Sequence, residues 1–191
     1  MIICLKVKQT FESYRLNRKR LAFFCISILL LSMSNPLYSK DKILNYLKNG
    51  VSFSIPSDWR TISDESLPDR GYFYSAESTT KNSTGLFSFV MVNNVENPVK
   101  SLLVQQTNMK EELIYKESGI EFTEFKKVRF GSMDATTVDY QTILKGIKIS
   151  GTIYCFNCSE KTYFLFFQSG IKDSKYNSKV FKMIELTFAC R

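Results

Sequence analysis

Residues 162–168, TYFLFFQ, are the segment from which the centre of the fold is predicted. Its five central residues, 163–167, are all aromatic or aliphatic, so both sides of the segment are apolar. Side chains of a β-strand point alternately to two faces, and a strand that is apolar on both faces suits the centre of a covered sheet. The sequence therefore predicts a central strand at 162–168 with other elements packed against both of its sides.

Further segments have the alternating pattern of strands that pack one face on a core. Those before the central strand are 51–55, 71–78, 85–92, 120–130, 135–144 and 148–156. Polar or glycine-containing turns separate them, including the loop 79–84, which joins two strands expected to pair. This order predicts a first group of strands and a later meander that ends on the central strand.

Three segments are predicted as helices. Residues 41–48 form a short helical candidate that Asn49-Gly50 would stop. Asn97-Pro98 is a cap followed by a proline at the first helical position, and apolar residues then recur at helical spacing over 99–118. The closing segment 176–188 shows the same spacing. Strands and helices in this order predict an α+β domain in which helices pack on an antiparallel sheet.

The N-terminus has the layout of an export signal. Arg18-Lys19-Arg20 precedes an uncharged apolar run at 21–34, which is shorter than a typical membrane span. The expected organisation is a signal segment at 1–39, removed after a residue between Ser34 and Ser39, and a single domain at 40–191. An uncleaved anchor remains the alternative, and in both cases the basic flank stays in the cytoplasm. The domain is therefore expected outside it, periplasmic or secreted.

The formal net charge of +8 is concentrated at the N-terminus. Residues 1–20 hold six basic side chains against one acidic side chain, which leaves 20 basic and 17 acidic residues from position 40 onward, a net charge of +3. A domain with so small a positive excess lacks the basic field that holds phosphates. Nucleic acid is therefore not expected as a partner.

Three cysteines, Cys155, Cys158 and Cys190, belong to the predicted domain and are its disulfide candidates. If the last helix runs antiparallel to the strand 162–168, its end returns to the start of that strand, where the turn 157–161 and both hairpin cysteines lie. Cys190 is therefore predicted to pair with one of them. The spacing does not choose between Cys155 and Cys158, and a bond between those two stays open as an alternative.

The sequence contains no histidine, which excludes Ser-His-Asp and Cys-His catalysis and every histidine-ligated metal site. Cys155 and Cys158 have the spacing of a redox pair, but they lie where one strand turns into the next and not at a helix N-terminus. Glycine-rich phosphate loops are absent. No catalytic residue, cofactor site or metal site is predicted, and the lone Trp59 is expected in the core.

Several motifs, taken in order, resemble the PsbP-like family, which includes the extrinsic photosystem subunit, the Ran-binding Mog proteins and DcrB. They are GVSFSIP at 50–56 followed by Trp59, then the strand candidates 135–140, 148–154 and 162–168, then Tyr176 and 181–188. The resemblance implies an antiparallel sheet of about six strands sandwiched between helices on both faces. It also implies a non-catalytic binder, adaptor or assembly factor.

The expected function is an exported, non-enzymatic binding or assembly module whose partner is another protein or an envelope component. Contact with a membrane is expected only if the N-terminal segment stays uncleaved. The alternative is an exported hydrolase or thiol-redox enzyme that uses Ser, Asp or Cys. Two surfaces are predicted for the partner: the helix 99–118, and a sheet edge at 71–78 where Tyr72 and Tyr74 would be exposed.

Overall fold

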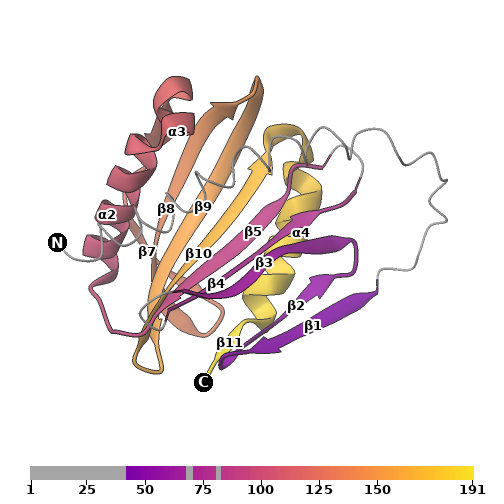
Figure 1. The fold of residues 1–191 in the computed structure, drawn as a ribbon, viewed down its shortest axis with the longest axis vertical. Coiled ribbons are helices and arrows are strands. Elements are labelled where there is room, and N and C mark those ends of the chain that lie inside the picture. Colours follow the sequence, from indigo (N-terminus) through magenta and orange to yellow (C-terminus); the bar gives the residue numbers. More distant parts are fainter. Residues whose placement is uncertain (1–41, 68–70, 81–82) are drawn as a thin grey trace. The chain divides into compact units, whose positions relative to one another are not determined.

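A computed structural model describes residues 42–67, 71–80 and 83–191 (Figure 1). The predicted signal segment, with its cleavage site, lies outside the described residues. The strands of the main sheet are β3 (Trp59–Leu67), β4 (Gly71–Ser78), β5 (Leu86–Val92), β6 (Ile120–Phe122), β7 (Lys126–Phe130), β8 (Met133–Leu144), β9 (Ile147–Cys158) and β10 (Lys161–Gly170). The other elements are β1 (Ile43–Lys48), β2 (Val51–Pro56), α2 (Pro98–Glu111), α3 (Leu113–Ser118), a 3₁₀ turn (Ile171–Asp173), α4 (Ser174–Thr187) and β11 (Ala189–Cys190).

The main sheet is antiparallel and has eight strands, in the order β3-β4-β5-β10-β9-β8-β6, with β7 also paired to β8. The predicted central strand is confirmed, because β10 lies between β5 and β9. Neighbouring side chains of β10 enter different apolar clusters. Tyr163, Leu165 and Phe167 belong to one cluster, and Phe164 and Phe166 pack against the other.

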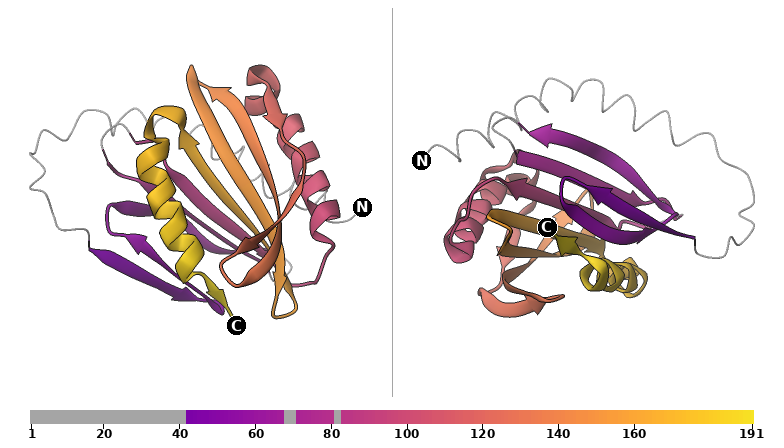
Figure 2. Two further views of the ribbon diagram at one scale, coloured as in Figure 1. Left: turned by 180° about the vertical axis from the view of Figure 1, so that it is seen from behind. Right: turned by 90° about the horizontal axis from the view of Figure 1, so that it is seen from below.

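The two clusters draw on different elements. The larger one contains Val180 and Ile184 of α4 together with Phe53 of β2, and the smaller one contains Leu102 and Met109 of α2. Figure 2 shows α4 running beside the strands of the small sheet. Trp59 belongs to the larger cluster and is 4% exposed, as predicted. The larger cluster thus lies between the main sheet and a mixed cover of α4 and the small sheet, and the smaller cluster lies between the main sheet and α2.

The α+β class and the antiparallel sheet are confirmed, but two details of the predicted fold are wrong. The main sheet has eight strands where about six were expected. The helices are few and do not by themselves cover both faces of the sheet: α2 contacts mainly β8, β9 and β6, while α4 shares its layer with β1, β2 and β11. The small sheet β1-β2-β11 covers much of a face of the main sheet that the resemblance predicted to be covered by helices.

The predicted helix at 41–48 is also wrong, because residues 43–48 form the strand β1. β1 pairs antiparallel with β2, and the Tyr46 ring stacks on the Phe53 ring with centroids 4.7 Å apart. Asn49 and Gly50, interpreted as a helix stop, both have positive φ, of 52° and 77°. Two central residues with positive φ, and the pair Asn-Gly, are typical of a tight β-hairpin turn.

Two other predicted elements are divided. The helix expected over 99–118 breaks at Glu112, whose φ and ψ of −63° and 132° are extended, so α2 and α3 are separate helices. The strand expected over 120–130 splits into β6 and β7, which pair with different parts of β8. The chain between them crosses beside Asp139, where the Thr123 N–H donates to the Asp139 carbonyl at 3.0 Å.

Candidate functional site

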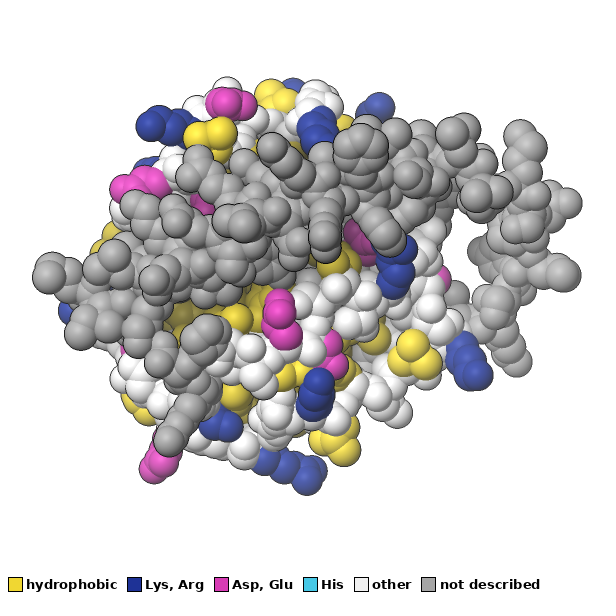
Figure 3. All heavy atoms as spheres, viewed as in Figure 1, with side chains coloured by type: hydrophobic (Ala, Val, Ile, Leu, Met, Phe, Trp, Pro, Cys, Tyr) yellow, Lys and Arg dark blue, Asp and Glu magenta, His cyan; other side chains and the backbone are white. Residues whose placement is uncertain are grey.

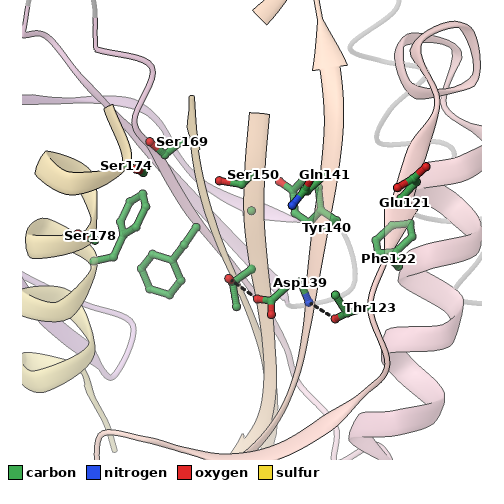
Figure 4. Close-up of a pocket in the computed structure, with 14 residues that line it drawn as sticks. Glu121, Phe122, Thr123, Asp139, Tyr140, Gln141, Ser150, Ser169, Ser174 and Ser178 are labelled. Atoms are coloured by element: carbon green, nitrogen blue, oxygen red, sulfur yellow. Dashed lines mark hydrogen bonds between the residues drawn. The ribbon is translucent and has the colours of Figure 1, made fainter. Parts of the chain in front are cut away.

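A cleft of about 550 Å³ lies over β8, β9 and β10, between α4 and β6 (Figure 4). Figure 4 shows Ser174 and Ser178 of α4 on one side of it and Glu121 and Phe122 on the other. Ligand sites in proteins are usually concave and combine apolar walls with a small number of converging polar groups. This cleft is therefore the candidate functional site.

Strand register brings the polar lining together from residues far apart in the sequence. Gln141 is paired with Glu121 on one side and Ser150 on the other, and Ser150 is paired with Ser169. Residues paired across strands share a face of the sheet. Four strands thus place these four side chains in one row, which forms part of the floor.

The next row is held by hydrogen bonds among its own members. Asp139, Thr152 and Phe167 are register partners on β8, β9 and β10. The Thr152 hydroxyl donates to Asp139 Oδ1 at 2.7 Å, and the Asp139 N–H donates to the Thr123 hydroxyl at 3.1 Å. The first bond orients the carboxylate at the floor of the cleft, and the second connects β8 to the segment that follows β6 (Figure 4).

Other lining side chains remain available for a ligand. Glu121, Gln141, Ser150 and Ser174 line the cleft, and within the described residues their side chains make no hydrogen bond. Together they provide hydroxyl, carboxamide and carboxylate groups, which supply both donors and acceptors. Such a set can hold a polar group that is neutral or cationic, because Glu121 and Asp139 are the charged residues among those lining the cleft.

The hydroxyls of the cleft have no histidine to act as their base, since the chain contains none. Burial raises the pKa of the Tyr140 phenol, whose hydroxyl donates to Gln168 Oε1 at 2.9 Å. Burial, with a contribution from Glu185 and Asp139, also raises the pKa of Tyr154. Phenols held neutral in this way serve as hydrogen-bonding groups and not as bases.

The described residues offer neither a metal site nor a membrane-spanning helix. No group of three or more His, Cys, Asp or Glu among residues 42–67, 71–80 and 83–191 could hold a metal ion. In the same part of the chain, no helix is both long and apolar enough to cross a membrane.

The predicted disulfide candidates separate into a bonded pair and a free thiol. Cys158 is bonded to Cys190, with Cα atoms 6.3 Å apart, and the bond attaches the C-terminal β11 to the end of β9. Cys155 is buried and free. Burial, with a contribution from Glu96, raises the pKa of the Cys155 thiol to about 12, which suppresses the thiolate that redox chemistry needs.

The exposure predicted for Tyr72 and Tyr74 is wrong, because both residues are 2% exposed. The β1–β2 hairpin covers them: the Tyr46 ring lies 4.6 Å from the Tyr74 ring, and the Tyr46 hydroxyl donates to the Tyr72 hydroxyl at 3.3 Å. Nor is 71–78 an edge, since β4 lies between β3 and β5. The expected face on the helix 99–118 does contain exposed apolar side chains, among them Leu103 and Leu113.

Sequence reasoning missed the residues of the cleft. Gln141, Ser150 and Ser174 are polar positions in a strand or helix that otherwise look like ordinary solvent-facing residues. Alternation could have placed Gln141 and Ser150 on one face of paired strands. It could not have shown that α4 and β6 wall that face, since this depends on contacts remote in sequence.

No protein-family model matches the chain. No curated protein matches it either. Solved structures do: cyanobacterial PsbP (CyanoP) from Synechocystis sp. PCC 6803 is 10% identical with a TM-score of 0.54, over 83% of this chain and 98% of that one. A protein from Bacteroides thetaiotaomicron VPI-5482 is 13% identical with a TM-score of 0.51, over 77% of this chain and 48% of that one. The chain has a PsbP-like fold.

Proposed function

We propose that this chain is an exported, non-enzymatic binding or assembly module that holds a polar group of an envelope partner in the cleft between α4 and β6. The observation that carries the proposal is that Glu121, Gln141, Ser150 and Ser174 line one cleft while their side chains make no hydrogen bond within the described residues. Unpaired donors and acceptors that converge on one space are what a recognition site requires.

Several further observations support the proposal. The PsbP-like neighbours suggest an accessory or assembly module. The charged residues that line the cleft are the carboxylates Glu121 and Asp139, and the Asp139 carboxylate accepts a hydrogen bond from the Thr152 hydroxyl.

A disulfide between Cys158 and Cys190 suits a compartment outside the cytoplasm. Figure 3 shows acidic and basic side chains interspersed over one face, where a nucleic-acid binder would carry a basic field.

The test is a comparison of two substitutions on β9. Ser150→Tyr fills the cleft, whereas Lys148→Tyr puts the same side chain two residues away on the same face of the strand, outside the cleft lining. Each protein is cross-linked in intact cells, and co-purifying envelope components are quantified by mass spectrometry. We expect components captured by the wild type and by Lys148→Tyr to be lost with Ser150→Tyr. Unchanged capture by Ser150→Tyr would refute the role of the cleft.

A further inference from the structure

The β1 strand has an unpaired outer edge. In the small sheet, in the order β1-β2-β11, β1 pairs with β2 and no other described strand borders it (Figure 1). Figures 1 and 2 show β1 as the outermost strand of that sheet. The side chains of Ile43 and Leu47 are 54% and 79% exposed. An exposed apolar edge strand is a template for pairing with another chain.

The backbone shows which groups point outward from that edge. The Ser57 N–H donates to the Lys42 carbonyl at 2.7 Å, so the polar backbone groups of Lys42 point toward β2. Successive residues of an antiparallel strand point these groups to opposite sides. The N–H and C=O groups of Ile43, Asn45 and Leu47 therefore point away from β2.

The other strand edges are protected. β3 carries Arg60, Asp64 and Glu65 and has a bulge between Thr61 and Ser63. β6 is three residues long, β11 is two residues long, and β7 carries three basic residues. Charges, bulges and short length are the usual means of preventing edge pairing. β1 is six residues long with Lys48 as its one charged side chain.

The exposed residues of β1 are complementary to a second copy of themselves. Two identical antiparallel strands related by a twofold axis must place some residue opposite its own copy. If Asn45 is that residue, Ile43 lies opposite Leu47 of the second copy, and all three of the outward-pointing residues form hydrogen-bonded pairs. The apolar side chains then cover each other, and about six backbone hydrogen bonds form.

One unfavourable contact in this register is reduced by the fold. It places Lys48 opposite Lys42 of the second copy, but the Lys48 ammonium already lies 3.0 Å from Asp64 Oδ2 of its own chain. We propose that the protein self-associates by antiparallel β1–β1 pairing centred on Asn45, which joins two small sheets into one. This inference goes beyond the proposed function, since it uses no residue of the cleft.

The test measures oligomeric state by sedimentation velocity on the full-length gene product as purified from cells. Leu47→Lys and Ile43→Glu should each weaken self-association about tenfold or more, because each places a charge opposite an apolar side chain. Mixing the two variants should restore association, since the introduced carboxylate of one would then face the introduced ammonium of the other. Ile62→Lys, at a 53% exposed position on β3, is the matched control and should change nothing.

The register has its own test. Asn45→Cys should cross-link to a second copy on oxidation, because paired Cα atoms about 5.5 Å apart suit a disulfide. Leu47→Cys should not, since its copy lies four residues along the strand, about 13 Å away. A protein that stays monomeric at all concentrations, or a dimer that neither charged variant weakens, would overturn the inference. Cross-linking of Leu47→Cys but not Asn45→Cys would overturn the register.

Discussion

Two buried tyrosines of the main sheet differ in the partner of the hydroxyl group. The Tyr140 hydroxyl donates to Gln168 Oε1 at 2.9 Å. The Tyr163 hydroxyl is buried and has no hydrogen-bond partner among the described residues. An intramolecular hydrogen bond contributes about 1 kcal/mol net, whereas an unpaired buried hydroxyl costs about 1–3 kcal/mol. The same chemical group therefore affects stability in opposite directions at the two positions.

We predict that Tyr163→Phe leaves the free energy of unfolding unchanged or raises it by about 1 kcal/mol. Tyr140→Phe, the matched control, should lower it by about 1 kcal/mol, because Gln168 Oε1 then loses its donor. Urea denaturation of both variants measures the difference. A larger loss for Tyr163→Phe than for Tyr140→Phe would mean that the Tyr163 hydroxyl has a partner after all.

Tyr140 and Tyr163 should also make the stability of the protein depend on pH in the alkaline range. Burial raises the pKa of both phenols above the ordinary value of 10.0. A group whose pKa is raised by folding stabilises the protein below its unfolded pKa, and this contribution is lost as pH rises toward the folded pKa. Stability should therefore fall above about pH 10, and it should fall less steeply in either Phe variant.

At the scale of elements, β11 illustrates how a short segment is held in place. It pairs with β2 through two residues, and the Arg191 N–H donates to the Gly50 carbonyl at 2.8 Å. The Cys158–Cys190 bond then attaches it to the end of β9 across a sequence separation of 32 residues. So short a strand has few ladder hydrogen bonds of its own, which makes the covalent attachment important.

We predict that replacing both Cys158 and Cys190 with Ser lowers the free energy of unfolding by about 3–4 kcal/mol, the chain-entropy value for a loop of this length. Urea denaturation without reductant measures it. As the control, dithiothreitol should bring the wild type to the stability of the variant and leave the variant unchanged. A wild-type free energy of unfolding that dithiothreitol does not change would argue against the Cys158–Cys190 bond.

At the scale of the whole molecule, the two sheets and α4 share one aromatic cluster. The Phe188 ring, between α4 and β11, lies 6.2 Å from Phe53 of the small sheet. It also lies 6.4 Å from Phe89 and 5.8 Å from Phe156 of the main sheet. Aromatic rings at these distances add to the stability that burial provides. The small sheet is therefore part of the same core.

The N-terminal segment 1–39 is predicted to be removed on export. We expect the purified protein to begin after a residue between Ser34 and Ser39, because the basic flank and apolar run resemble a cleavable signal. N-terminal sequencing measures this directly. Leu29→Arg, which interrupts the apolar run, should leave a protein that begins at Met1 and is not exported. A wild-type protein held in the membrane with Met1 intact would show that the segment is an anchor.

Local patterns determined much of the fold by themselves. Alternation located β4, β5, β8 and β9 to within a few residues, because the side chains of a strand alternate between its two faces. The doubly apolar 163–167 predicted the central position of β10, and the spacing of apolar residues predicted α4. Order along the chain was enough for the α+β class and for the PsbP-like resemblance.

Contacts between remote segments decided the rest. A six-residue run such as ILNYLK is compatible with a helix or a strand. It forms a strand here because pairing with β2 stacks the Tyr46 ring on the Phe53 ring. Alternation put Tyr72 and Tyr74 on one face of β4, but whether that face meets water depended on the hairpin that covers it. Cys155 and Cys158 are three residues apart, so their side chains point to opposite sides of β9. Cys158 forms the disulfide because its side chain points to the side on which β11 lies. Periodicity states which side chains share a face, while packing determines what each face contacts.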